Sequence, residues 1–147
     1  MEIEVLNNHL LLLPQRAIYW QEKQALILSD LHFGKTTHFR KAGIPVPEAL
    51  FQDDLATLNH LVATHNPKQL IVVGDMFHSH HNNEVEQFAE WRLANNLLDI
   101  HLILGNHDIL GKSKYDELNL QLSDVYVRDG FTFSHEPIPG TSSFNFS

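Results

Sequence analysis

Side chains suited to acid–base or metal chemistry follow one apolar stretch of this sequence directly. Residues 100–104 are mostly apolar, which is typical of a β-strand buried on both faces, and the stretch ends at a glycine. Asn106, His107 and Asp108 come next. An amide oxygen, an imidazole and a carboxylate offer a metal ligand, a proton carrier and an orienting group. The alternative is an ordinary polar turn, in which Asn and Asp are common.

The same pattern recurs three more times along the chain. Each time a short apolar stretch ends at acidic or imidazole side chains: Asp30 and His32 after 25–28, Asp75 after 69–73, and His135 after 131–133. Because parallel strands present their carboxyl ends at one edge of a sheet, we expect these groups to converge. Such mixed ligands suit Mn²⁺, Fe or Zn²⁺ better than Ca²⁺. The set is too large for one tetrahedral ion and suits two ions about 3.5–4 Å apart.

The hydrophobic patterning predicts the elements that would position these groups. Short connections at both ends of the chain favour antiparallel hairpins, and Asp129-Gly130 is a strong hairpin signal. Alternating strands and helices in the middle favour a right-handed βαβαβ core with parallel strands, and hence a mixed sheet covered by helices. We expect strands at residues 3–6, 10–13, 16–20, 25–28, 69–73, 100–104, 125–127, 131–133 and 144–147, and helices at 35–42, 47–65 and 84–98.

Length and composition limit the classes of protein that this chain can be. Its 147 residues are enough for a single domain, 1–147, with a substantial core. The apolar runs are too short for a membrane span, and the absence of cysteine suits the cytoplasm. The formal net charge of −8 argues against a broad nucleic-acid-binding surface. It does not argue against a phosphodiester that is reached through bound metal ions. The oligomeric state is left open.

Four motifs resemble, in order, the first four motifs of the calcineurin-like metallophosphoesterases. They are Ser29-Asp30-Leu31-His32, Gly74-Asp75, Gly105-Asn106-His107-Asp108 and Ser134-His135. The resemblance implies an α/β fold of mixed β-sheet layers with flanking helices, arranged as four αββα layers and short at the C-terminus. The last family motif, Gly-His-x-His, is absent, because the chain ends about where that motif should begin. We therefore expect that the native protein is longer; the alternative is an incomplete metal site.

Two details indicate which branch of this superfamily the chain resembles. His78 stands where the phosphoprotein phosphatases of this superfamily usually carry an aspartate, and a histidine there resembles the DNA-repair nuclease branch. The segment from Ser29 to Pro47 is similar to small bacterial metallophosphoesterases described as DNA-ligase-associated and proposed to be DNA-damage-response endonucleases. The resemblance implies a two-metal phosphodiesterase that acts on DNA among repair proteins, with Mn²⁺ the expected ion. Hydrolysis would proceed by in-line attack of a hydroxide that bridges the ions.

The resemblance also implies a role for each candidate residue. Asp30 and His32 would hold the first ion, Asp75 would bridge both ions, and Asn106 and His135 would hold the second. His107 would stabilise or protonate the departing oxygen, and His78 would contact the scissile phosphate or orient His107. From the residues alone, and not from the resemblance, three further side chains would form a cationic rim for substrate phosphates or, alternatively, a solvated helix face: Lys35, His38 and Arg40.

Other interpretations remain open at this point. A phosphomonoesterase on the same scaffold is the close variant, and a non-catalytic protein-interaction module with an incomplete metal site is the rival. Several histidines fit ordinary surface or core positions better than a site: His9, His60, His65, His80, His81 and His101.

Overall fold

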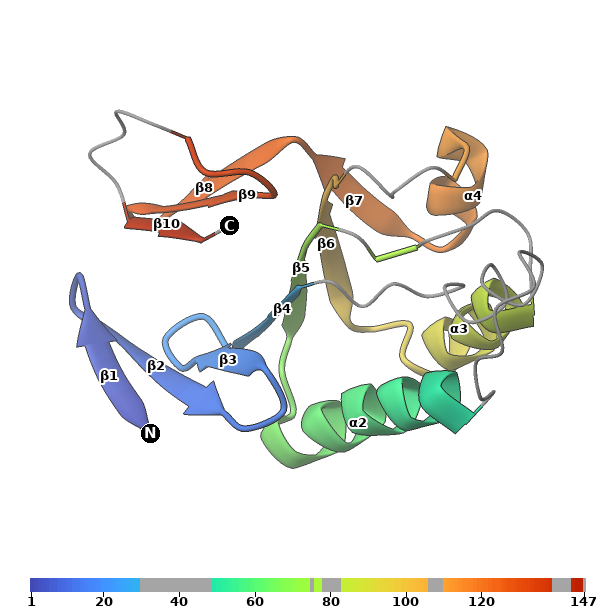
Figure 1. Ribbon diagram of the computed structural model, residues 1–147, viewed down its shortest axis with the longest axis horizontal. Coiled ribbons are helices and arrows are strands. Elements are labelled where there is room, and N and C mark those ends of the chain that lie inside the picture. Colours follow the sequence, from blue (N-terminus) through green and yellow to red (C-terminus); the bar gives the residue numbers. More distant parts are fainter. Residues whose placement is uncertain (30–48, 75, 78–82, 106–109, 139–143, 147) are drawn as a thin grey trace.

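The computed structural model describes residues 1–29, 49–74, 76–77, 83–105, 110–138 and 144–146 (Figure 1). In these residues, seven strands form one sheet whose spatial order follows the chain. They are β1 (Glu2–Val5), β2 (Asn8–Leu13), β3 (Ala17–Trp20), β4 (Ala25–Ser29), β5 (Gln69–Val73), β6 (Asp99–Ile103) and β7 (Leu120–Ser123). Strands β1 to β4 pair antiparallel, and β4 to β7 pair parallel. The opening hairpins and the parallel core are thus confirmed.

Helices connect the parallel strands and cover one face of this sheet. Helix α2 (Ala49–His65) lies between β4 and β5 in the chain, α3 (Asn83–Ala94) between β5 and β6, and α4 (Lys112–Glu117) between β6 and β7. Helix α3 ends before the predicted residue 98, because a turn closed by the Leu98 amide to the Asn95 carbonyl (3.2 Å) leads into β6. The predicted helix at 35–42 lies outside the described residues.

Helix α4 and strand β7 are elements that the patterning did not predict. A six-residue helix is too short to show a clear helical period, and only its Tyr115 is buried. Strand β7 did leave a signal, since leucines alternate at 118, 120 and 122, and Leu118 and Leu120 are buried. The parallel part of the sheet therefore has one strand more than expected.

A second sheet packs on the other face. It has the order β10-β9-β8, with β8 (Val125–Arg128) and β9 (Phe131–Ser134) antiparallel and β10 (Phe144–Phe146) parallel to β9. Asp129 and Gly130 both have positive φ angles, 49° and 81°, as a two-residue hairpin turn requires. The residues had favoured one mixed sheet, but the chain leaves the first sheet after β7 and builds a separate layer.

Two apolar cores hold these layers together. Alternate residues of each parallel strand point to opposite faces, so that Leu70 and Val72 of β5 face the helices while Ile71 and Val73 face the second sheet. Phe131 and Phe133 of β9 are fully buried between the sheets. The described residues therefore form helices, sheet and sheet, which confirms the predicted α/β class with stacked sheets. The second helix layer expected from the αββα arrangement has no counterpart among them.

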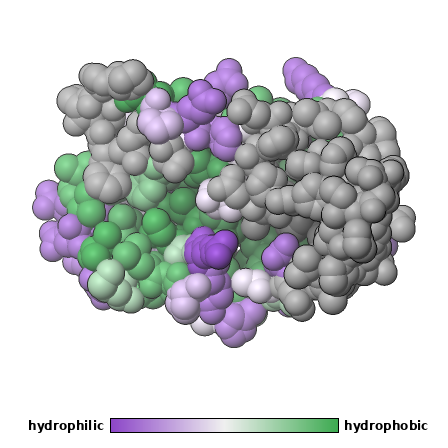
Figure 2. Space-filling view, viewed as in Figure 1, coloured by the Kyte–Doolittle hydropathy of each residue, from purple (hydrophilic) through white to green (hydrophobic). Residues whose placement is uncertain are grey.

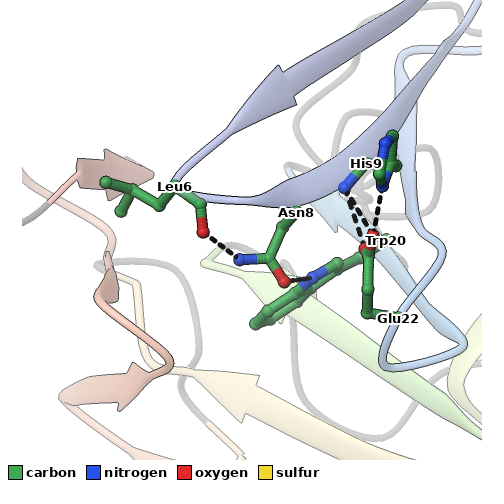
Figure 3. Close-up of polar contacts among 5 residues, drawn as sticks. All are labelled: Leu6, Asn8, His9, Trp20 and Glu22. Carbon is green, nitrogen blue, oxygen red and sulfur yellow. Dashed lines mark hydrogen bonds and ion pairs between the residues drawn. The ribbon is translucent and has the colours of Figure 1, made fainter.

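The N-terminal hairpin is fixed to the inter-sheet core by a buried polar contact (Figure 3). Trp20 is fully buried, and its indole Nε1–H donates to Asn8 Oδ1 at 2.8 Å. Asn8 Nδ2 in turn donates to the Leu6 carbonyl at 2.9 Å. At the surface beside them, His9 pairs with Glu22 at 2.5 Å, and this hydrogen bond raises the pKa of His9. His9 is thus a structural residue, as expected.

The two hairpins also meet at one side of the molecule. A side chain at Gly130 would come within 3.2 Å of Leu6 Cδ1, so the β1–β2 and β8–β9 turns are in contact. Figure 2 shows hydrophobic residues gathered on the left of the view, where Figure 1 draws these hairpins. Within the described ranges, no helix combines the length and hydrophobicity that crossing a membrane requires.

Candidate metal centre

Three parallel strands end level with one another at the carboxyl edge of the large sheet. Ser29 of β4 pairs in register with Val73 of β5, which pairs with Ile103 of β6. Asp30 follows Ser29 directly in the sequence, Asp75 comes two residues after Val73, and Asn106 comes three after Ile103. The sheet therefore brings the chain to one edge at each of the first three motifs, as the strand pattern predicted.

Gly74 continues the sheet for one more residue at this edge. Its amide donates to the Ile103 carbonyl at 2.7 Å, and the Leu104 amide donates to the Ser123 carbonyl at 2.9 Å. Gly74 has a φ of 74°, a conformation that residues with a side chain rarely adopt. The backbone turns here, just before the position of Asp75.

His135 reaches the same edge from the second sheet. A Cβ atom placed on Gly74 would lie 2.0 Å from His135 Nδ1 and 2.7 Å from its Cγ. The half-buried imidazole therefore packs directly on the Gly74 backbone, where only glycine leaves room for it. Two motifs that lie about sixty residues apart in the sequence thus come into contact.

A short turn fixes the approach of His135. Ser134 is 3% exposed, and its hydroxyl donates to the Glu136 carbonyl at 2.7 Å. This side-chain bond closes the chain around His135 as β9 ends. Glu136 itself is exposed.

The remaining candidate residues are not placed by the structure. Nine of them lie outside the described residues: Asp30, His32, Lys35, His38, Arg40, Asp75, His78, Asn106 and His107. Within the described ranges, no three His, Asp or Glu side chains lie close enough together to hold a metal ion. The described geometry therefore consists of the strand ends that lead to these residues, together with His135.

Two cavities flank the end of β4 at this edge. One, of about 210 Å³, lies toward helix α2 and includes Arg16, Ser29, Asp54 and Thr57 in its lining. The other, of about 150 Å³, lies between the two sheets and includes Arg16, Ser29, Val73 and Phe146. The sequence pattern predicts a strand at 16–20 and does not indicate that Arg16 lies here, because nothing in it relates the 14–16 turn to β4.

Two of the histidines interpreted as ordinary surface or core residues, His65 and His101, make packing contacts away from the carboxyl edge. His65 stacks on Tyr19 with ring centroids 5.0 Å apart. His101 is 8% exposed, lies 2.8 Å from Ser123 Oγ through Nε2, and stacks on Tyr126 at 4.1 Å. Burial lowers the pKa of His101, so this imidazole is held neutral between the sheets.

The comparison with known families decides the kind of protein. The profile of the family described as Calcineurin-like phosphoesterase matches residues 24–146, which is most of the chain. The chain belongs to the calcineurin-like phosphoesterase family. It is accordingly a phosphoesterase, and the metallophosphoesterase resemblance of the four motifs is confirmed.

Among solved structures, the phosphoesterase is similar to the nuclease MPE of Pseudomonas putida. The sequences are 30% identical, the TM-score is 0.85, and the match covers 99% of this chain and 70% of that one. No curated protein matches the chain at a significant level. The structural likeness extends over essentially the whole fold described above.

Members of this phosphoesterase family generally bind two divalent metal ions. The donor set fits such ions, because carboxylate and amide oxygens with imidazole nitrogens suit divalent transition metals. The contact between His135 and Gly74 also places one imidazole at the edge where the acidic motifs begin.

Proposed function

We propose that this phosphoesterase is a two-metal phosphodiesterase that cleaves nucleic acid, with DNA as its substrate. The observation that carries the proposal is the contact of His135 with Gly74, which joins the fourth motif to the second at the carboxyl edge. The likeness of the fold to a nuclease, the P. putida protein, supports a diester rather than a monoester substrate.

The proposed metal ligands come from all four motifs. Asp30 and His32 would hold one ion, Asn106 and His135 the other, and Asp75 would contact both. When bound, two divalent ions supply Lewis acidity to a phosphoryl group and a nucleophile at neutral pH. We propose Mn²⁺ as the ion, since Mn²⁺ accepts both hard oxygen donors and imidazole.

The other candidate residues would act on the substrate. His107 is proposed to protonate the departing oxygen, because imidazole is the side chain most often used as a proton donor in catalysis. His78 would contact the scissile phosphate or orient His107. Lys35, His38 and Arg40 would give a cationic rim for phosphates in an otherwise acidic chain. A bacterial DNA-repair setting in the cytoplasm, with repair-protein partners, is proposed from the Ser29–Pro47 segment alone.

Comparing substrates tests this proposal directly. With Mn²⁺ present, we expect hydrolysis of a bis-aryl phosphate diester to exceed that of an aryl phosphate monoester. Single- and double-stranded DNA should then both be tested as polymer substrates. Cleavage of the monoester alone would contradict the nuclease proposal and favour a phosphomonoesterase.

A variant at His107 tests the proposed proton donor. His107→Ala should lose about 100-fold or more in kcat while it retains bound Mn²⁺, because the imidazole acts on the leaving group and not on the ions. His60→Ala, on the exposed surface of α2, is the matched control. A parallel loss of metal and turnover in His107→Ala would show that His107 is a ligand instead.

A further inference from the structure

Arg16 occupies an unusual backbone position close to the candidate metal centre. It lies in the β2–β3 turn with a φ of 60°. Several other residues with positive φ are asparagine or aspartate, such as Asn66, Asn119 and Asp129, which tolerate this conformation well. Arginine is not a residue type that this turn conformation favours, so the local backbone does not explain why Arg16 is at this position.

The surroundings of Arg16 connect it to the end of β4. Arg16 and Ser29 both line the cavity toward α2 and the cavity between the sheets. Arg16 is the one cationic residue among the described residues that line these two cavities. Since Asp30 follows Ser29 in the sequence, Arg16 lies beside the strand end at which the first motif begins.

The guanidinium of Arg16 is available for an external partner. Arg16 is exposed, and the described part of the chain provides it with neither an ion pair nor a hydrogen bond. Lys23, by contrast, forms an ion pair with Asp129 at 2.5 Å. In a chain of net charge −8, an unpaired guanidinium beside the site is a place where an anion is favoured.

The two cavities differ in how well they would accept a phosphate. The cavity toward α2 has an acidic residue, Asp54, in its described lining. The cavity between the sheets has no acidic residue in its described lining and combines Arg16 and Ser29 with apolar side chains such as Ile18 and Phe146. A phosphate fits this second side of Arg16 better.

We propose that Arg16 binds a phosphate of the nucleic-acid strand next to the scissile one, on the side that faces the second sheet. The planar guanidinium donates two parallel hydrogen bonds to phosphate oxygens, a geometry that lysine does not reproduce. The inference rests on the proposed function and adds to it a preference for polymeric substrates over isolated diesters. Arg16 is thus a substrate-positioning residue.

Arg16→Asn is the variant that tests this proposal. Asparagine accepts the positive φ, so the turn is kept while the cation is removed. Lys68→Asn is the matched control, because it removes one exposed positive charge at the opposite, amino edge of the sheet. Arg16→Lys keeps the charge without the two parallel hydrogen bonds.

The primary readout is a ratio of specificity constants. In Arg16→Asn, kcat/KM for a single-stranded oligonucleotide relative to that for a bis-aryl phosphate should fall about tenfold, mainly through KM. The slope of log binding against log salt should decrease by about one. Arg16→Lys should recover part of the ratio, and Lys68→Asn should match the wild type within about twofold.

Binding measured without cleavage separates the two proposals. Fluorescence anisotropy with a labelled oligonucleotide should show affinity about tenfold weaker for Arg16→Asn than for Lys68→Asn. If the wild type cleaves no diester, the proposed function is contradicted. The binding comparison still tests whether Arg16 contacts a phosphate of the oligonucleotide. If Arg16→Asn and Lys68→Asn agree within twofold in ratio and in binding, the Arg16 proposal is overturned.

Discussion

The two edges of the parallel sheet are built differently. At the amino edge, backbone hydrogen bonds close the connections: the Lys68 amide donates to the Gln24 carbonyl at 2.8 Å, and the Asp99 amide donates to the Lys68 carbonyl at 3.1 Å. At the carboxyl edge, β4 and β5 lead into acidic motifs, and an imidazole from another sheet packs on Gly74. Polar residues at the amino edge begin the parallel strands, whereas we propose that those after the carboxyl edge bind metal ions and substrate.

This difference shows what the second sheet contributes. The parallel sheet alone aligns the strand ends that lead to three motifs, and His135 packs on one of them, at Gly74, because β8 and β9 pack over the inter-sheet core. The requirement for glycine at position 74 follows from that packing and from the positive φ angle. We therefore expect substitutions of Gly74 and of the proposed ligands at the carboxyl edge to weaken metal binding, and substitutions in the N-terminal hairpin and the inter-sheet core to leave it unchanged.

Gly74→Ala should have the largest effect. The added Cβ would collide with the His135 ring and would also impose a positive φ on alanine. We expect Mn²⁺ affinity to fall by about 100-fold and the free energy of unfolding by about 1–2 kcal/mol. Isothermal titration calorimetry and chemical denaturation measure the two effects.

Gly111→Ala is the control for the Gly74 substitution. Gly111 has a negative φ of −63°, and the nearest atom to an added Cβ is 4.0 Å away. We expect unchanged Mn²⁺ affinity and near-normal stability. Equal effects at the two glycines would show that the contact between Gly74 and His135 has no special role.

His135→Ala should have the next largest effect. Removal of a proposed ligand should weaken Mn²⁺ binding by about 10- to 100-fold while the fold is retained, since His135 is only half-buried. The thermal midpoint without metal should stay close to that of the wild type. Wild-type metal affinity in this variant would exclude His135 from the metal centre.

Asn8→Ala should affect stability without affecting metal binding. The substitution leaves the buried Trp20 Nε1–H without its acceptor, which costs about 1–3 kcal/mol of the free energy of unfolding. A double variant with Trp20→Phe should lose less than the sum of the single variants, because the orphaned donor is gone. A large change in Mn²⁺ affinity would contradict the expectation that the N-terminal hairpin does not influence the metal centre at the carboxyl edge.

The smallest effect should be a pH dependence due to His101. Burial lowers its folded pKa below 6.5, so below about pH 6.5 the unfolded state binds more protons and the free energy of unfolding falls. At pH 8 the contribution is absent. His101→Gln should therefore lose less stability than the wild type between pH 7.5 and pH 5.5 in denaturation experiments.

Comparing His101→Gln with the wild type separates the pH dependence due to His101 from that due to His9. The raised pKa of His9 acts in the opposite direction, stabilising the fold at low pH and losing that contribution as the pH rises. Both proteins retain His9, so its effect cancels in the difference. An identical pH dependence in the two would mean that His101 is not held neutral.

The sequence predicted the parallel core well because its strands are continuous apolar runs that end at glycine or polar residues. Residues 69–73 are β5 as expected, and the Asp129-Gly130 hairpin is present. The second sheet as a separate layer was not visible in the residues, because strand pairing depends on distant contacts and not on local pattern. For the same reason the Gly74–His135 contact and the position of Arg16 required the fold.

We propose that the carboxyl edge of the large sheet holds two divalent ions through motifs that are far apart in the sequence. The most direct test is the number of Mn²⁺ ions bound per chain, measured by elemental analysis after loading and removal of free metal. We predict two ions per wild-type chain and fewer than one in Asp75→Asn, which removes the proposed shared ligand. No bound Mn²⁺ in the wild type, or the same amount in Asp75→Asn, would contradict the account.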